Sequence, residues 1–596
     1  MGRTEATIAD IDGDGFPDYL TSTNDGSIAA SLNTRGRSNL LKGVQRPLGG
    51  FFSVDYARSG NTYAQPHNRW VMALLTVNDG QPGDGADAQV TSFAWSGGFY
   101  ERRERQFFGF AQCIETHLDP ANNNAPYRTV TRAYNNGTYY LKGLLAEETL
   151  ADASGNKYTD AVYTYSVRDE STQQPLANPS DLSAAGFPQH VRTDKSWFEG
   201  QPAAGKSTYE TFAYDQYGNV TVYVDGADRG PAGVVEARIG YFQDLAGYIV
   251  GKANAITVLG GGQVMRQRQA TFQAGTGNLL EVVKTLGSGV AAVWDFTYDA
   301  YGNIKTVTGP ANASGQRYQR SYSYDTAVNT YVTGVTDSFG YQSTADYDPR
   351  FGAVTRSTDI NNQSISTQYD AAGRPIAVVG PYEQGTGRVT IAMDYHPGAA
   401  QPWAHTAHLD LNRGPSASID TVTFMDGLGR VTQTKKSLAL HTSGNASTDV
   451  MSVSGRVIYD GFGRAAAQYY PTTEPLGQAG TLNAALDSAP PTRTVYDVLD
   501  RPLPVANPAN ETTRFAYGFG ADRSNAQQFL TRVTDANGVP RDVFRNVHDA
   551  SERWPPQAGS GRSGVPIPTK SPADSDFDAP MIPILIRPPF RDLSAR

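Results

Sequence analysis

The sequence contains a single cysteine, Cys113, in 596 residues. One cysteine cannot form an internal disulfide, and it excludes a zinc site built from several thiolates. Long apolar runs are also missing: no stretch approaches 18 consecutive apolar residues, so no transmembrane helix is expected. Only 18% of the residues are charged and the net charge is −9. This balance argues against a protein that binds nucleic acid by neutralising phosphates.

Turn-forming and aromatic residues are abundant instead. The chain has 61 glycines, 35 prolines and 33 tyrosines, against 7 methionines. Glycine and proline mark turns and tyrosine favours strands, so this composition disfavours a helical bundle and predicts an all-β protein. With 39% hydrophobic residues the chain can bury a core. Its length predicts about four domains, or fewer if the units are large β folds.

A Tyr-Asp-x-x-Gly-Asn/Arg pattern recurs through the second half of the sequence, and its densest copies start at 324, 347 and 369. That spacing suits two strands and two turns. The full copies are Tyr214-Asp215 with Gly218, Tyr298-Asp299 with Gly302, Tyr369-Asp370 with Gly373, and Tyr459-Asp460 with Gly463. Variants are Tyr347-Asp348, Asp426 with Gly429, and Tyr496-Asp497, while Tyr324-Asp325 keeps only the first half.

The residues of one copy explain why it should form a β-hairpin. Trp294, Phe296 and Tyr298 alternate along the chain, so they share one face of a strand. Asp299 is placed to cap the turn, and Gly302 stands where a short hairpin loop needs a positive φ. One hairpin cannot bury its own aromatic face, whereas stacked neighbours can, which predicts a continuous β strip. The alternative is a set of unrelated hairpins that share common turn residues.

An acidic loop near the start of the chain has the composition of a cation site. Its carboxylates Asp10, Asp12, Asp14 and Asp18 occupy loop positions 1, 3, 5 and 9, and the carbonyl of Phe16 falls at position 7. Hard oxygen ligands at this spacing suit Ca²⁺ in a structural role. The loop is not an EF-hand, because a threonine stands at position 12. The alternative is an Asp/Gly-rich turn that binds no metal.

Motifs for catalysis are missing from the sequence. His405, His408 and Asp410 form a short cluster, which we place in a linker between repeats, and no glutamate general base lies between the histidines. There is no Gly-x-Ser-x-Gly elbow, no phosphate-binding loop and no Glu-x-Glu pair. The sequence therefore predicts a protein that is not an enzyme.

The repeated turns, over residues 210–549, resemble the YD repeats of the RHS family of bacterial polymorphic toxins and toxin-complex shell proteins. Two stretches, at residues 39–56 and Gly98–Phe110, resemble the middle region of the TcdB/SpvB-type insecticidal toxin-complex B component. The acidic loop resembles the FG-GAP/VCBS loops of β-propeller blades.

This resemblance implies four segments: a partial propeller blade (1–34), a TcdB-type middle region (35–165), an RHS-type β shell (166–549) and a Pro-rich irregular tail (550–596). It implies that the propeller docks onto a pore-forming A component, and that the shell, completed by a C component, encloses a toxic effector. Assembly in the cytoplasm followed by secretion or surface display is expected, with no nucleic-acid partner. Family members extend beyond both ends, so we expect a fragment.

The function predicted from these observations is structural: the aromatic-lined strands build a wall around a passenger polypeptide, in a secreted toxin complex that contributes to virulence. The alternative is a cell-surface RHS adhesin that binds glycans through exposed tyrosines. Binding to a C-component partner would support the first function, and hits on a glycan array would support the second.

Overall fold

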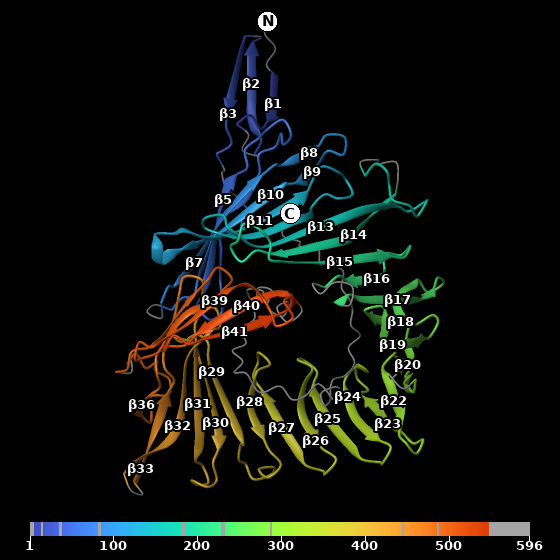
Figure 1. The fold of residues 1–596 in the computed structure, drawn as a ribbon. Helices are drawn as coiled ribbons and strands as arrows, with labels where there is room; N and C mark the ends of the chain where they lie inside the picture. Colours follow the sequence, from blue (N-terminus) through green and yellow to red (C-terminus); the bar gives the residue numbers. More distant parts are fainter. Residues whose placement is uncertain are drawn as a thin grey trace. The chain divides into compact units, whose positions relative to one another are not determined.

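The computed structural model describes residues 5–12, 16–24, 26–34, 39–81, 85–179, 185–227, 233–285, 289–443, 446–485 and 488–547. These residues form antiparallel β-sheets (Figure 1), together with a short 3₁₀ helix, η1 (Pro120–Asn122), so the all-β prediction is confirmed. Among the described residues no helix is long and apolar enough to cross a membrane. The predicted irregular tail, 550–596, lies outside the described residues.

A small sheet at the start of the chain contains β1 (Glu5–Ala9), β2 (Asp18–Asn24) and β3 (Ser27–Ser31) in that order. Ile8 opposes Tyr19 in the register of β1 and β2. Both side chains are exposed, as is Ile28 of β3. The acidic loop connects β1 to β2, so its two ends are held by paired strands.

The large sheet follows chain order, because most consecutive strands form hairpins. Its strands, neighbour by neighbour, are β4 (Gly43–Gln45), β5 (Phe51–Arg58), β6 (Trp70–Asn78), β7 (Ala88–Ser96), β10 (Gln112–Asp119), β11 (Ala125–Asn135), β12 (Leu144–Asp152), β13 (Lys157–Asp169), β14 (Gly186–Trp197), β15 (Lys206–Tyr214), β16 (Val220–Asp225), β17 (Val235–Asp244), β18 (Ile249–Gly260), β19 (Gln263–Phe272), β20 (Leu279–Thr285), β21 (Ala291–Tyr298), β22 (Ile304–Ala311), β23 (Arg317–Tyr324), β24 (Val332–Asp337), β25 (Gln342–Asp348), β26 (Ala353–Thr358), β27 (Ser364–Tyr369), β28 (Pro375–Val379), β29 (Ile391–His396), β30 (Trp403–Leu409), β31 (Ser418–Met425), β32 (Val431–Ser443), β33 (Ala446–Val453) and β36 (Thr472–Pro475).

A third sheet continues the hairpins with β34 (Val457–Tyr459), β35 (Ala465–Gln468), β37 (Thr492–Tyr496), β38 (Pro502–Ala506), β39 (Thr512–Ala521), β40 (Gln527–Thr534) and β41 (Pro540–Arg545). A separate pair, β8 (Phe99–Glu101) and β9 (Gln106–Gly109), comes from the stretch that resembles the TcdB middle region. The large sheet is continuous across residues 165–166, since β13 spans them.

Few strand residues are fully buried, and several strands are half-buried along their whole length. Every residue of β6, β16 and β38 is half-buried. A compact core of fully buried side chains occurs where Val422, Phe424 and Met451 pack together, with Trp403 and Leu482 against them. The sheet is therefore held together mainly by strand pairing and side-chain links between neighbours.

The predicted linker around His405 is wrong. Trp403–Leu409 is strand β30, paired with β29 and β31. The histidine Nε2 lies 3.0 Å from Asp420 Oδ1 on the neighbouring strand. The nearby prolines and glycines fall in the turns on either side of the strand, which is why the composition of the segment was misleading.

Candidate functional site

The repeated turn has one backbone conformation, and Asp299–Asn303 shows it clearly. Oδ1 of Asp299 accepts hydrogen bonds from the amides of Tyr301 (2.8 Å) and Asn303 (2.9 Å). The amide of Gly302 donates to the carbonyl of Asp299, and φ of Gly302 is +85°. The aspartate therefore replaces the backbone partners that the turn lacks, while glycine adopts the left-handed conformation.

The predicted glycines Gly218, Gly373, Gly429 and Gly463 have φ between +77° and +86° in turns capped in the same way by Asp215, Asp370, Asp426 and Asp460. In the turn of Asp497 the positive φ belongs to Asp500, at +60°. Two copies differ. The turn of Asp348 is closed by Gly352, one position later, and the turn of Asp325 is longer and reaches Tyr331.

The tyrosine before each turn links its repeat to the preceding one. The hydroxyl of Tyr324 donates to the carbonyl of Ile304 (2.9 Å), the first residue after the preceding turn. The strand register shifts immediately before Tyr324, and such a bulge redirects the side chain toward that carbonyl. The same link is made by Tyr214, Tyr298, Tyr369, Tyr459 and Tyr496, to the carbonyls of His190, Leu279, Val354, Val431 and Ala465. Tyr347 instead stacks on Tyr331, with ring centroids 5.0 Å apart.

Several tyrosine links and turns of the same kind do not match the Tyr-Asp sequence pattern. Tyr165, Tyr241, Tyr395 and Tyr517 make the same hydroxyl-to-carbonyl link without a following aspartate. Turns of the same form, without a preceding tyrosine, begin at Asp152, Asn312, Asp337, Asp359, Asn507, Asp522 and Asp535. An aspartate or asparagine followed three positions later by glycine or asparagine would have found most of these turns.

The last position of the turn makes short-range contacts in the early copies. Asn219 Nδ2 donates to Asp215 of its own turn and to the carbonyl of Val250 (2.8 Å). Asn303 Nδ2 donates in the same way to the carbonyl of Asn329 (2.7 Å). Val250 lies at the start of β18, and Asn329 lies in the connection between β23 and β24, so each asparagine joins its turn to the backbone of a nearby hairpin.

The last position makes long-range contacts in the late copies, and Arg430 gives the first example. Its Nε pairs with Asp426 of its own turn, and its terminal nitrogen lies 2.7 Å from Oδ2 of Asp79, in the β6–β7 loop. Both carboxylates are almost fully buried. The burial raises the pKa of Asp79, and the hydrogen bond from Gln81 and the charge of Arg430 oppose that rise.

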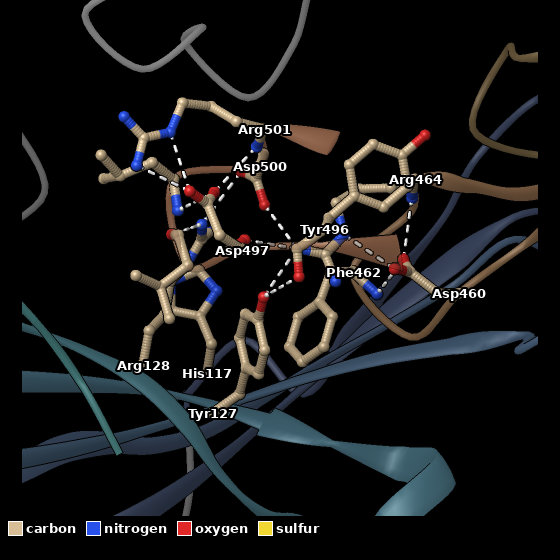
Figure 2. Close-up of polar contacts among 12 residues, drawn as sticks. His117, Tyr127, Arg128, Asp460, Phe462, Arg464, Tyr496, Asp497, Asp500 and Arg501 are labelled. Carbon is tan, nitrogen blue, oxygen red and sulfur yellow. Dashed lines mark hydrogen bonds and ion pairs between the residues drawn. The ribbon is translucent and has the colours of Figure 1, made fainter. Parts of the chain in front are cut away.

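Arg464 makes the second long-range contact (Figure 2). One terminal nitrogen lies 3.0 Å from the hydroxyl of Tyr127, on β11, and 2.8 Å from Asp500 Oδ1, while its Nε binds Asp460. Asp500 also pairs with Arg128 of β11, at 2.9 Å. Burial opposes the charged form, but the bonds to Tyr127 and Asp460 raise the pKa of Arg464 above its ordinary value.

Arg501 makes the third contact. It forms a two-pronged ion pair with Glu199, at 2.9 and 2.6 Å, in addition to its bond with Asp497. The side chain of Glu199 is only 3% exposed. We call these contacts the seam, and define it by Asp79, Tyr127, Arg128 and Glu199 from the first part of the chain and Asp426, Arg430, Asp460, Arg464, Asp497, Asp500 and Arg501 from the late turns.

A second charged cluster lies beside the seam on strands β10 to β12. Arg132 binds Glu115 and Glu148, each at 2.7 Å, and His117 lies 2.9 Å from Glu115. Burial works against ionisation of Glu115, yet the hydrogen bonds from His117 and Arg132 lower its pKa to about 2. His117 also opposes Arg128 in the register of β10 and β11, so the cluster adjoins the seam directly (Figure 2).

The acidic loop brings three of its predicted ligands together. Carboxylate oxygens of Asp10, Asp12 and Asp18 lie within 4.8 Å of one another. Asp18 is buried, and its two oxygens accept hydrogen bonds from the amides of Ile11 (2.9 Å) and Asn33 (2.8 Å). Those bonds, led by Asn33, lower the pKa of Asp18. Asp14 lies outside the described residues. Phe16 is described, at the end of the loop.

Two segments of the chain match known family models. Residues 1–143 match the family model of the insecticide toxin TcdB middle/N-terminal region, and residues 399–520 match a domain of unknown function, DUF6443. No curated protein matches the chain.

Three solved structures have the same fold over most of this chain. The crystal structures of TcdB2-TccC3 and TcdB2-TccC3-Cdc42 give TM-scores of 0.64 and 0.65 at 13% identity, and cover 92% and 91% of the chain. The Photorhabdus luminescens Tc holotoxin pore gives a TM-score of 0.64 at 12% identity and covers 91%. The chain spans about two fifths, 39%, of each solved chain. The resemblance to a TcdB-like toxin-complex B component is therefore confirmed.

Proposed function

We propose that this TcdB-like chain is a structural, non-catalytic carrier segment of a secreted toxin complex, and that its sheets form part of an RHS-type wall around an effector polypeptide. Solved structures with its fold contain TccC3, which supports a C-component partner for this chain as well. A pore-forming A component, reached through the propeller, is the second proposed partner. Assembly in the cytoplasm and later secretion or surface exposure complete the proposal.

The observation that carries this proposal is the combination of tyrosine links and seam. Hairpin after hairpin is tied to its predecessor by a hydroxyl, as in Tyr298 and Tyr324. Arg430 and Arg501 then tie the late hairpins to loops 351 and 302 residues earlier. A sheet that is only half-buried along its strands gains rigidity from such links, and a rigid wall suits containment better than it suits turnover.

Co-expression tests the carrier role. We expect the chain to co-purify with TccC3 and to slow the digestion of the C-terminal region of TccC3 by added protease. A matched double variant of exposed residues away from the seam, R350Q/R532Q, is expected to protect equally well. Equal digestion of TccC3 with and without the chain would contradict the proposal.

We also propose that the acidic loop binds Ca²⁺ in a structural role, held by Asp10, Asp12 and Asp18. Three carboxylates this close repel one another, and a divalent cation bound by oxygen ligands removes that repulsion. Calcium should therefore raise the melting temperature of the wild-type chain over that in EDTA. The D10A/D12A variant should lose the rise, whereas D535A, in a turn near the other end, should keep it. A rise that persists in D10A/D12A would place the ion elsewhere.

A further inference from the structure

The two faces of the sheet around strands β19 to β23 carry charge in different arrangements. In an antiparallel pair, residues that oppose each other lie on the same face. Arg268 opposes Lys284, and Lys284 opposes Ala292 of β21. Phe296, four positions further along β21, opposes Val307, which opposes Arg320. Since residues two apart in a strand share a face, one face carries Arg266, Arg268, Lys284 and Arg320. We call these four residues the basic face.

The four cations of the basic face are exposed, and none of them forms an ion pair within the described part of the chain. Between residues 263 and 324 the sequence has three carboxylates, Glu281, Asp295 and Asp299. On the next strand, Asp337 opposes Arg320 and caps its own turn, so one carboxylate lies at the β24 end of the basic face. Glu281 and Asp295 oppose each other on the other face, and Asp299 caps its turn.

Cations on the opposite face are neutralised. Arg317 lies 2.5 Å from Asp295, and Arg238 lies 2.5 Å from Glu236. Arg238 opposes Thr257, which opposes Gln267, so it shares the face of the odd-numbered residues of β19. Arg266, Arg268 and Lys284 thus form a group of positive charges with no carboxylate opposite any of them, in a chain whose net charge is −9.

Aromatic rings support part of the basic face. The ammonium of Lys284 lies over the ring of Trp294, 4.8 Å from its centroid, and the guanidinium of Arg320 lies over Tyr318, at 5.7 Å. Such contacts orient a cation without neutralising it. The charges therefore remain available to an outside anion.

We propose that the basic face binds an acidic polypeptide segment in extended conformation, supplied by a partner protein. Charges two residues apart on a strand are separated by about 7 Å, which is also the spacing of alternate side chains in an extended peptide. Carboxylates at alternate positions of such a segment match Arg266 and Arg268 along the strand, and Lys284 on the next strand. A nucleic acid or an anionic membrane fits less well, because its charge extends beyond the patch onto a surface that is negative overall.

The proposal is independent of the carrier role, since it rests on the charge of one face alone. Its direct test is fluorescence anisotropy with a labelled ten-residue peptide of alternating glutamate and threonine. We expect the full chain to bind this peptide at low salt, and R266Q/R268Q/K284Q to bind it about tenfold more weakly. The R238Q/R317Q variant, which changes the opposite face, should bind as the wild type does.

Further measurements distinguish the other outcomes. Binding to the wild type should weaken steeply as salt is raised, a result that needs no variant to fold. Equal binding of an alternating lysine–threonine peptide, or an unchanged affinity in the triple variant with native circular dichroism, would overturn the proposal. Tighter binding of oligothymidine or of phosphatidylserine vesicles, lost in the triple variant, would assign the face to a different class of partner and overturn it as well.

Discussion

The early turns, Asp215–Asn219 and Asp299–Asn303, and the late turns that end at Arg430, Arg464 and Arg501 share one backbone conformation but use their last side chain differently. Early asparagines contact backbone carbonyls 26 to 31 residues away. The late arginines contact residues more than 300 positions earlier. A short amide can bond only to a neighbouring hairpin, whereas a guanidinium can hold its own turn and a distant carboxylate together. The same turn therefore links neighbouring hairpins when it ends in asparagine, and links distant parts of the chain when it ends in arginine.

The largest difference between the two regions is expected from R430N. This variant replaces the arginine that ends a late turn by the asparagine that ends the early turns. Asp79 and Asp426 would lose their shared cation while staying buried, and breaking a buried ion pair costs about 3–5 kcal/mol. Urea unfolding should show this loss, and hydrogen exchange should rise in the β6–β7 loop. The control N303A removes the early contact and should cost about 1 kcal/mol. Equal costs would mean that the seam adds nothing to the turns.

The second largest effect is expected from acid, which should destabilise the charged cluster around Glu115 beside the seam. The folded pKa of Glu115 is about 2, below its unfolded value of 4.5. Its contribution is therefore present above pH 4.5 and is lost as the pH falls toward 2. At pH 7 the E115Q variant should be less stable than the wild type by about 1–3 kcal/mol, and the difference should shrink between pH 4.5 and 2. E236Q, in an exposed ion pair, should cost less than about 1 kcal/mol at any pH. A pH-independent E115Q effect would contradict the linkage.

Substituting alanine for a turn glycine in each region, G302A and G463A, compares the cost of the positive φ in the early and late turns. A Cβ at Gly302 meets nothing within 4 Å, so G302A should cost about 1–2 kcal/mol through the positive φ alone. At Gly463 the added Cβ would also lie 2.6 Å from Gln89 Nε2 and 3.3 Å from a terminal nitrogen of Arg430. Thermal unfolding should therefore show G463A to be the more destabilised variant. The reverse order would mean that the late turn lies less close to these groups than the structure shows.

The smallest effect, expected to be the same in both regions, concerns the tyrosine hydroxyls. Y324F in the early sheet and Y496F in the late sheet each remove one hydroxyl-to-carbonyl bond of 2.9 Å. Each should cost about 1 kcal/mol in urea unfolding. A much larger loss in only one of them would show that the link differs between the regions.

The local structure was predictable from the sequence because it depends on nearby residues. Asp299 and Gly302 are separated by three positions, and the turn they form is determined by that spacing. The seam was not predictable, because nothing in the sequence distinguishes Arg374 from Arg464. Arg374 lies over the ring of Tyr395 in a neighbouring strand, while Arg464 reaches Tyr127 on β11. Which contact an arginine makes depends on the path of the sheet between them.

In the acidic loop, too, some contacts were predictable from the sequence and others were not. Its carboxylate spacing was visible in the sequence, and Asp10, Asp12 and Asp18 do lie together. The amide of Asn33, which fixes Asp18, comes from beyond β3 and carries no sequence signal. The basic face was equally hidden, since Arg268 and Lys284 are brought together by strand register rather than by spacing.

The tyrosine links have a consequence for how the chain folds during synthesis. Each hydroxyl bonds to a carbonyl made only about 15 to 31 residues earlier, as in Tyr369 and Tyr496. A newly made hairpin can therefore fasten onto the one before it as soon as it leaves the ribosome, and contacts between residues close in sequence form quickly. The arginines at 430, 464 and 501 are translated after most of the strands, so their distant attachments form after most of the hairpins have paired. Each new hairpin thereby covers the strand edge left by the one before it, and the seam forms afterwards.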